Sequence, residues 1–143
     1  MKPSDLPIAG WQAIAQSHLA AATILASHTV PQPDEALYLA GFALEVTMKG
    51  KGLQEGVAVD PIHDLEELFV RSQVLRPARA TRIPATSASA LKLAADTTYW
   101  DLFDFVRSQW FNELRYSVGN TLPETAVNFV DTVKELEGWI WAA

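Results

Sequence analysis

The sequence has no cysteine, and this absence excludes several kinds of site. Without thiols the chain cannot form a disulfide bond, a thiolate zinc site or a Cys–His catalytic pair. HExxH and comparable ligand clusters are also missing, so we expect no metal ion. The phosphate-binding glycine loop and the GxSxG turn of serine hydrolases are absent too, and no cofactor is expected.

Long apolar runs and an excess of basic charge are lacking as well. The longest nearly uncharged helical stretch, Ala36–Met48, is shorter than the roughly 20 residues that span a membrane, and Glu45 interrupts it. Met1–Asp5 shows no apolar run behind a basic region, so we expect no secretion signal and a cytoplasmic protein. The net charge of −6 argues against broad, non-specific binding of nucleic acid.

Four arginines nevertheless lie close together in the sequence: Arg71, Arg76, Arg79 and Arg82. One interpretation is that they solvate a loop. The other is that they form an edge that contacts phosphate groups.

Helical periodicity runs through almost the whole chain, and no strand pattern or internal repeat interrupts it. The spacing of apolar residues, prolines and caps predicts helices over 5–27, 34–53, 60–75, 87–95, 99–118 and from 121 onward, the last with a capping box of Thr121 and Glu124. Residues 76–87 are predicted to form a loop. We therefore expect one all-α domain over residues 1–143, an up-and-down bundle of five or six helices.

The helix predicted over 34–53 is apolar nearly all round, which is typical of the central helix of a bundle. Gly41 lies inside it, although a glycine there costs roughly 1 kcal/mol relative to alanine. The close approach of a neighbouring helix would explain this glycine.

Glu45 is the most informative charge, because it lies in the middle of this apolar helix. A buried carboxylate must be protonated, paired or hydrogen-bonded. Lys49 follows four residues later, in the favourable order for a helical ion pair. Two interpretations stay open: a simple helix-surface pair, or an inward polar site that recruits residues from other helices.

Four further residues could take part in binding or catalysis. His63 lies near a helix start, where the dipole favours a neutral imidazole, and a packing or capping role competes with catalysis. Arg115 could pair with a buried acid such as Glu45 or bind a phosphate. Its neighbours Trp110 and Tyr116 could pack in the core or stack on a base.

Three stretches together resemble the HEPN family of small helical bundles: Tyr38–Glu45 with Lys49, then His63-Asp64-Leu65, then Trp110 with Leu114-Arg115-Tyr116-Ser117. The resemblance implies a bundle of about five helices, often dimeric, acting in toxin–antitoxin or defence systems, in some cases beside a small nucleotidyltransferase.

Many members of that family cleave RNA without metal, through an arginine and a histidine separated by four to six residues. The arginine would be Arg115, but the histidine positions hold Asn120, Thr121 and Leu122. Asparagine cannot shuttle a proton near neutral pH. The resemblance therefore implies a protein with little or no ribonuclease activity of the usual kind.

We therefore expect a cytoplasmic, homodimeric HEPN-like binding module for a nucleotide, an RNA or a partner protein such as a nucleotidyltransferase. Its ligand-binding residues would be Glu45, Lys49, His63, Asp64, Trp110, Arg115 and Tyr116. The first alternative is a ribonuclease in which Arg115 holds the phosphate and His63 is the base. The second is a plain homo-oligomeric interaction protein.

Overall fold

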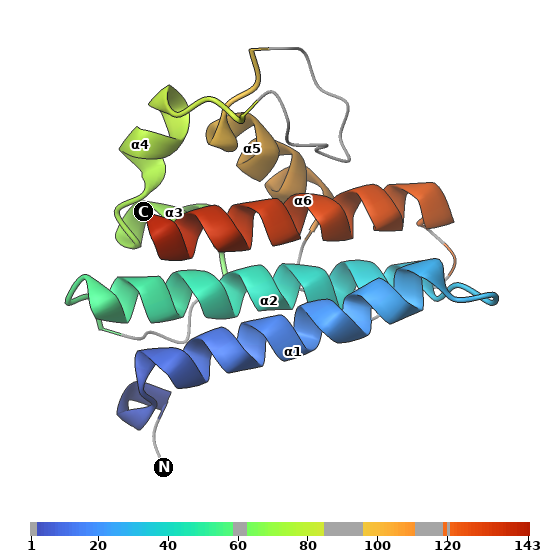
Figure 1. Cartoon of the computed structure of the whole chain (residues 1–143), viewed down its shortest axis with the longest axis horizontal. Helices are drawn as coiled ribbons and strands as arrows, with labels where there is room; N and C mark the ends of the chain where they lie inside the picture. Colours follow the sequence, from blue (N-terminus) through green and yellow to red (C-terminus); the bar gives the residue numbers. More distant parts are fainter. Residues whose placement is uncertain (1–2, 59–62, 85–95, 111–118, 120) are drawn as a thin grey trace.

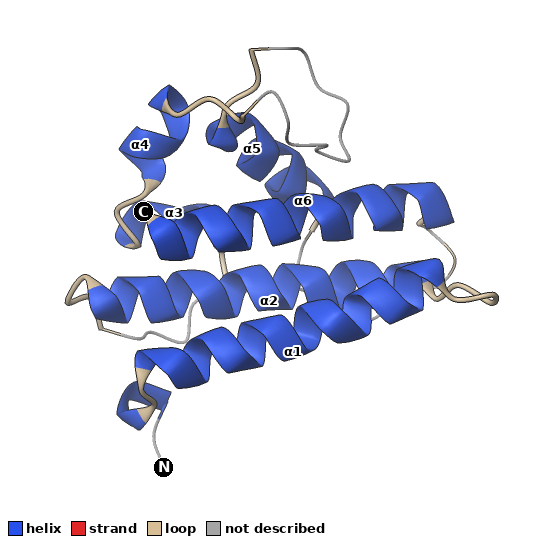
Figure 2. Ribbon diagram, in the orientation of Figure 1, coloured by secondary structure: helices blue, strands red, loops and turns tan. Residues whose placement is uncertain are grey.

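The structure is a computed structural model that describes residues 3–58, 63–84, 96–110, 119 and 121–143 (Figure 1). Its helices are the 3-10 turn Pro3–Asp5 and the α-helices α1 (Ile8–Ser27), α2 (Pro33–Gln54), α3 (Leu65–Arg71), α4 (Leu75–Ala80), α5 (Tyr99–Gln109) and α6 (Pro123–Ala142). Figure 2 shows helices and connections but no strand among these residues. The predicted all-α class with five or six helices is confirmed for the described part of the chain.

Three long helices, α1, α2 and α6, lie side by side, and the shorter helices α3 to α5 connect α2 to α6 (Figure 1). The α1 and α2 helices are antiparallel, as expected for an up-and-down bundle. The α2 and α6 helices instead run parallel. Near their beginnings the Gly119 amide donates to Asp34 Oδ2 (2.6 Å), and near their ends Lys51 Nζ donates to the main-chain oxygen of Ala143 (2.8 Å). An up-and-down order reverses the direction only between consecutive helices, so the parallel course of α2 and α6, which three further described helices separate, does not contradict it.

The α2 helix occupies the centre of the bundle, between α1 and α6 (Figure 1). Its bounds differ by one residue at each end from the predicted helix over 34–53. Most of its side chains from Ala36 to Gly52 are buried, as its uniform apolar character predicted. Burying apolar surface on all sides of one helix is the main source of stability in such a bundle.

The indole of Trp110, the residue directly after α5, packs against Gly41 of α2. A Cβ atom on Gly41 would overlap the Trp110 ring, and the Trp110 Nε1–H donates to the Tyr38 carbonyl at 3.1 Å. The predicted close approach at this glycine is confirmed, although a side chain and not a helix backbone makes it. Trp110 has extended backbone angles (φ −110°, ψ 132°), so the helix predicted over 99–118 already ends at Gln109.

The third predicted helix is shorter than expected and is followed by a separate one. The α3 helix begins at Leu65, where Asp64 caps it by accepting from the Glu67 amide at 2.8 Å. It ends at Arg71, and the positive φ of Gln73 (63°) separates it from α4. The α4 helix lies in the predicted loop, because a proline in the first turn of a helix leaves no hydrogen bond unmade.

The predicted capping box at Thr121 and Glu124 is wrong, because α6 begins after Leu122 without a side-chain cap. The capping box of the described residues is instead at α5, between Thr98 and Asp101. The helix predicted over 87–95 lies outside the described residues. None of the described helices combines the length and the apolar character needed to cross a bilayer.

Glu137 of α6 is a second buried acid that the sequence did not single out. Its side-chain oxygen Oε1 and the Nε1 atoms of Trp141 and Trp11 are buried without hydrogen-bond partners among the described residues. Burial raises the pKa of Glu137, and the nearby Trp141 side chain opposes part of that shift. Glu137 is therefore most easily accommodated in its neutral form.

We expect Glu137→Gln to stabilise the protein by about 1 kcal/mol near neutral pH. Because the folded-state pKa is raised, the wild type is stabilised below the unfolded pKa and loses this contribution as pH rises through the folded pKa. The variant has no titratable carboxyl at this position, so its stability does not fall in this way as the pH rises. Urea unfolding between about pH 5 and pH 8 measures it. The exposed Asp131→Asn on the same helix is the control, and parallel pH profiles of wild type and Glu137→Gln would contradict the prediction.

Candidate functional site

Glu45 places a carboxylate inside the central helix, with only 1% of the residue exposed. Such a group needs charged or hydrogen-bonding partners, because burial of an isolated charge is expensive. Two partners are present. Glu45 Oε1 lies 2.5 Å from His63 Nδ1 and 3.5 Å from Lys49 Nζ. The carboxylate therefore organises two cationic or polar side chains from two different segments.

His63 reaches Glu45 from the segment that leads into α3. The neighbouring Asp64 fixes the start of that helix, and His63 stands one residue before this cap. The imidazole directs Nδ1 at the carboxylate while half of its side chain (51%) remains exposed. An Nδ1–H that donates to Glu45 leaves Nε2 available to a further group.

Lys49 lies one helical turn after Glu45 and is held on the same face of α2. Its side chain is only 13% exposed, so its charge is partly desolvated. An ammonium group has three donors, and the contact with Glu45 accounts for one of them. Lys49 can therefore keep its place beside Glu45 and still donate to a ligand.

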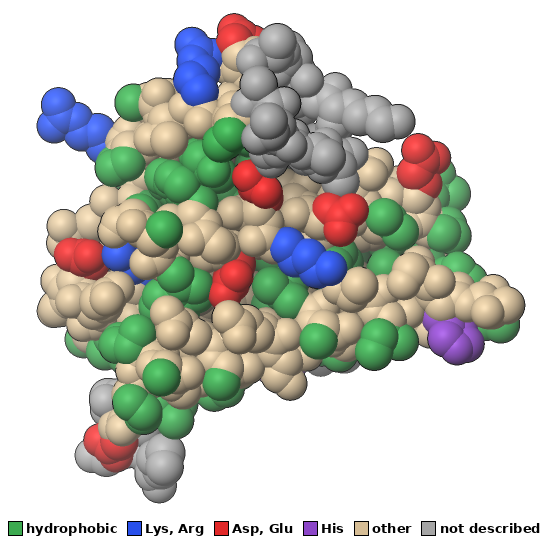
Figure 3. All heavy atoms as spheres, in the orientation of Figure 1, with side chains coloured by type: hydrophobic (Ala, Val, Ile, Leu, Met, Phe, Trp, Pro, Cys, Tyr) green, Lys and Arg blue, Asp and Glu red, His purple; other side chains and the backbone are tan. Residues whose placement is uncertain are grey.

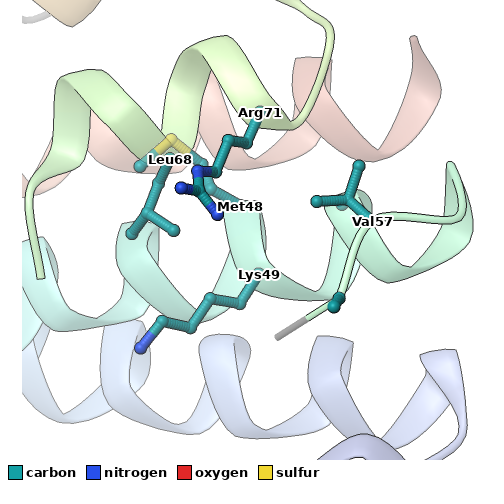
Figure 4. A pocket seen from close by; sticks show the side chains of 7 residues that line it. Met48, Lys49, Val57, Leu68 and Arg71 are labelled. Atoms are coloured by element: carbon teal, nitrogen blue, oxygen red, sulfur yellow. The ribbon is translucent and has the colours of Figure 1, made fainter. Parts of the chain in front are cut away.

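A small hollow opens beside Lys49, between α2 and α3 (Figure 4). Its wall combines two cationic side chains with apolar ones: Met48, Lys49, Gly52, Val57, Ala58, Leu68 and Arg71. In Figure 4 the Arg71 side chain extends from α3 toward α2, close to Met48 and Leu68. Lys49 and Arg71 thus both line the hollow, although in Figure 4 the Lys49 ammonium group points away from the Arg71 guanidinium.

Arg71 also pairs with Glu67, at 2.8 Å, one turn earlier in α3. Both side chains of this pair are well exposed, and exposed ion pairs contribute only about 0 to 1 kcal/mol. A ligand with a stronger negative charge can therefore compete with Glu67 for the guanidinium. The hollow has room for about one water molecule, so an anion such as a phosphate group would sit at its mouth, against Lys49 and Arg71, and not inside it.

The seven residues predicted for the site have different outcomes. Glu45, Lys49 and His63 are brought together. Asp64 is occupied as the cap of α3, and Trp110 is buried against Gly41. Arg115 and Tyr116 lie outside the described residues, so their places in the site stay predictions.

Arg71 was not among the predicted site residues, because the sequence singled it out only as one of four neighbouring arginines that could solvate a loop or contact phosphate groups. The apolar wall residues, such as Met48, Val57 and Leu68, carry no chemical signal in the sequence. The four-residue step from Glu67 to Arg71 indicates a helix there, and this was the one local signal for its position.

No cluster of three potential metal ligands occurs in the described part of the chain. Comparisons with family models, curated proteins and solved structures give no match to this chain.

Proposed function

We propose that this protein is a HEPN-type binding module that holds a phosphate group of a nucleotide or of an RNA at the mouth of the hollow between α2 and α3. The observation that carries the proposal is the arrangement of Lys49, which pairs with buried Glu45 and also lines a hollow reached by Arg71. Three motif residues of the HEPN resemblance, Glu45, Lys49 and His63, meet at the Glu45 carboxylate, and one of them, Lys49, also lines the hollow.

Charge and shape both favour phosphate as the recognised group. A lysine and an arginine provide the point charge and the planar fork that bind phosphate oxygens. Because Lys49 is nearly buried, its attraction for an anion is screened less than that of a surface lysine. The base and sugar of a nucleotide would lie outside the hollow, near the half-exposed His63.

Titration calorimetry with AMP and with adenosine tests this proposal. We expect AMP to bind and adenosine, which lacks the phosphate, to bind at least about tenfold more weakly, since a charged hydrogen bond contributes about 1.5–3 kcal/mol. Lys49→Gln and Arg71→Gln should each weaken the binding of AMP to a similar degree. Lys134→Gln, which removes an exposed charge from α6, is the matched control. Equal binding of AMP and adenosine would contradict the proposal, as would unchanged AMP affinity in both hollow variants.

The pair of Glu45 and His63 favours a second candidate, a metal-independent ribonuclease. A buried carboxylate at Nδ1 orients a histidine and leaves Nε2 as a base, which could take the proton from a ribose 2′-hydroxyl as it attacks the adjacent phosphate. The attack would form a 2′,3′-cyclic phosphate while the bond from phosphorus to the 5′-oxygen of the next nucleotide breaks, and that oxygen would take a proton from solvent. Arg115 would hold that phosphate.

Incubation of single-stranded and transfer RNA with the protein in chelator tests the second candidate on a gel. Cleavage by the wild type, lost in folded His63→Ala and Arg115→Ala variants, would establish the ribonuclease. Intact RNA in every lane would reject this candidate and leave the binding module.

The toxin–antitoxin or defence role, the homodimer and the nucleotidyltransferase-type partner belong to the same proposal and rest on the HEPN resemblance alone. Light scattering over a range of concentrations tests the homodimer, and a monomer at all of them would contradict it.

A further inference from the structure

The α4 helix presents two arginines that differ from the other described ones. Arg71, Arg82 and Arg107 each pair with a carboxylate: Glu67, Asp96 and Glu66 respectively. Arg76 and Arg79 are exposed and have no such pair among the described residues. Two unneutralised arginines within one short helix stand out in a chain with a net charge of −6.

Arg79 is held in place by an aromatic ring. Its guanidinium carbon lies 4.1 Å from the centre of the Trp100 ring, a cation–π contact between α4 and α5. Trp100 in turn packs against Phe69 and Phe103 of the core, so the ring is a fixed platform. A guanidinium stacked in this way loses little freedom when its N–H edge binds an anion.

The two arginines also have a defined spacing. They are three residues apart on α4, which places side chains at neighbouring positions on a helix surface, about 5–6 Å apart at Cβ. Basic side chains project from the α4 region in Figure 3, outside the mixed-charge surface of the long helices. This spacing allows each arginine to contact one of two successive anionic groups.

The kind of groups that α4 presents favours one of two kinds of anionic partner. Peptides are usually recognised through a sheet edge, an apolar groove or a pocket. The α4 helix offers exposed guanidinium groups, one of them stacked on an indole. Contacts to a nucleic-acid backbone need only such charges, since most of them go to phosphate oxygens and position the strand.

We propose that Arg76 and Arg79 form a contact surface for the phosphodiester backbone of a single-stranded nucleic acid. This surface goes beyond the phosphate-binding hollow and does not require it to be occupied. Each guanidinium binds one phosphate, and Trp100 keeps the guanidinium of Arg79 in position.

Fluorescence anisotropy with a labelled uridine oligomer of about 12 nucleotides tests this surface over a range of salt concentrations. The double variant Arg76→Gln, Arg79→Gln should lose about tenfold in affinity at low salt. It should also reduce the slope of log K against log salt by about 1.4, since each phosphate contact to a single strand contributes about 0.7. Lys134→Gln, on α6, should change neither quantity by a comparable amount. Arg79→Lys keeps the charge but loses the planar group that stacks on Trp100. Its affinity for the oligomer should therefore lie between those of the wild type and Arg79→Gln.

AMP binding at the mouth of the hollow serves as the second measurement on the same variants. Unchanged AMP affinity in the double variant shows that it is folded and that any loss belongs to α4. If the oligomer fails to bind the wild type at low salt, the inference is overturned, and the hollow is unaffected by that result. The inference is also overturned if the double variant has the same salt slope as Lys134→Gln. Displacement of the oligomer by polyglutamate as readily as by unlabelled oligomer would overturn it in favour of an acidic protein partner.

Discussion

Replacing Gly41 by alanine is expected to lower the free energy of unfolding by about 2–3 kcal/mol. An added methyl group would overlap the Trp110 indole, and overpacking of a well-packed core costs about 1–3 kcal/mol. Displacing the ring would also weaken or break the hydrogen bond from Trp110 Nε1 to the Tyr38 carbonyl. Such a hydrogen bond contributes about 1 kcal/mol. Alanine's better helix propensity, by about 1 kcal/mol, offsets only part of this loss.

Gly138→Ala on α6 is the matched control for this prediction. A Cβ atom there meets nothing within 4 Å, so the same substitution should stabilise the protein by about 0.5–1 kcal/mol. Urea unfolding of the two variants should show changes in the free energy of unfolding that have opposite signs. A Gly41→Ala protein as stable as Gly138→Ala would show that Trp110 does not fill the space above Gly41.

Lys49→Met is expected to destabilise the protein by about 2 kcal/mol at neutral pH. Methionine replaces most of the aliphatic stem, but it leaves the buried carboxylate of Glu45 with His63 as its one remaining described partner. Removing one partner of a fully buried pair costs about 3–5 kcal/mol. The half-exposed His63 should compensate for part of this.

A double variant separates the charge effect from any packing effect of Lys49→Met. Adding Glu45→Gln removes the carboxylate that lost its partner, so Lys49→Met with Glu45→Gln should recover at least about half of the stability lost. Chemical denaturation of wild type, both single variants and the double variant gives the interaction energy. If the double variant is as unstable as the sum of the two single variants, Glu45 and Lys49 are not energetically coupled, and the pair at 3.5 Å has no role in organising the site.

Regular, local patterns made the long helices predictable. The α2 helix has an apolar run and flanking prolines, and its bounds were predicted to within one residue. The divided region of α3 and α4 was not predictable in the same way. Its boundary depends on the positive φ of Gln73, and neither that angle nor the packing of Pro77 in a first turn has a periodic signal.

The parallel course of α2 and α6 depends on contacts between distant residues, such as Gly119 with Asp34, which are 85 positions apart. Periodicity within each helix cannot reveal the direction of one relative to another.

The candidate site shows the same division between local and tertiary information. The pairing of Glu45 with Lys49 follows from a four-residue step on one helix and was predicted. The contact with His63 joins residues 18 positions apart and was expected only as a possible recruitment from another helix. Arg71 enters the hollow because α3 packs over α2, which no motif indicated. Trp110 was expected in the pocket, but the glycine opposite it allows it to be buried in the core.

The hollow between α2 and α3 can be tested most directly through the methyl group of Met48. The chain has two methionines, Met1 and Met48, so methyl-labelled methionine gives two assignable NMR signals. Met48 lines the hollow beside Lys49. Titration with AMP should shift the Met48 signal to saturation, leave the Met1 signal in place, and have no such effect in Lys49→Gln. If AMP binds by calorimetry while the Met48 signal stays where it is, the ligand lies elsewhere and the account of this site is wrong.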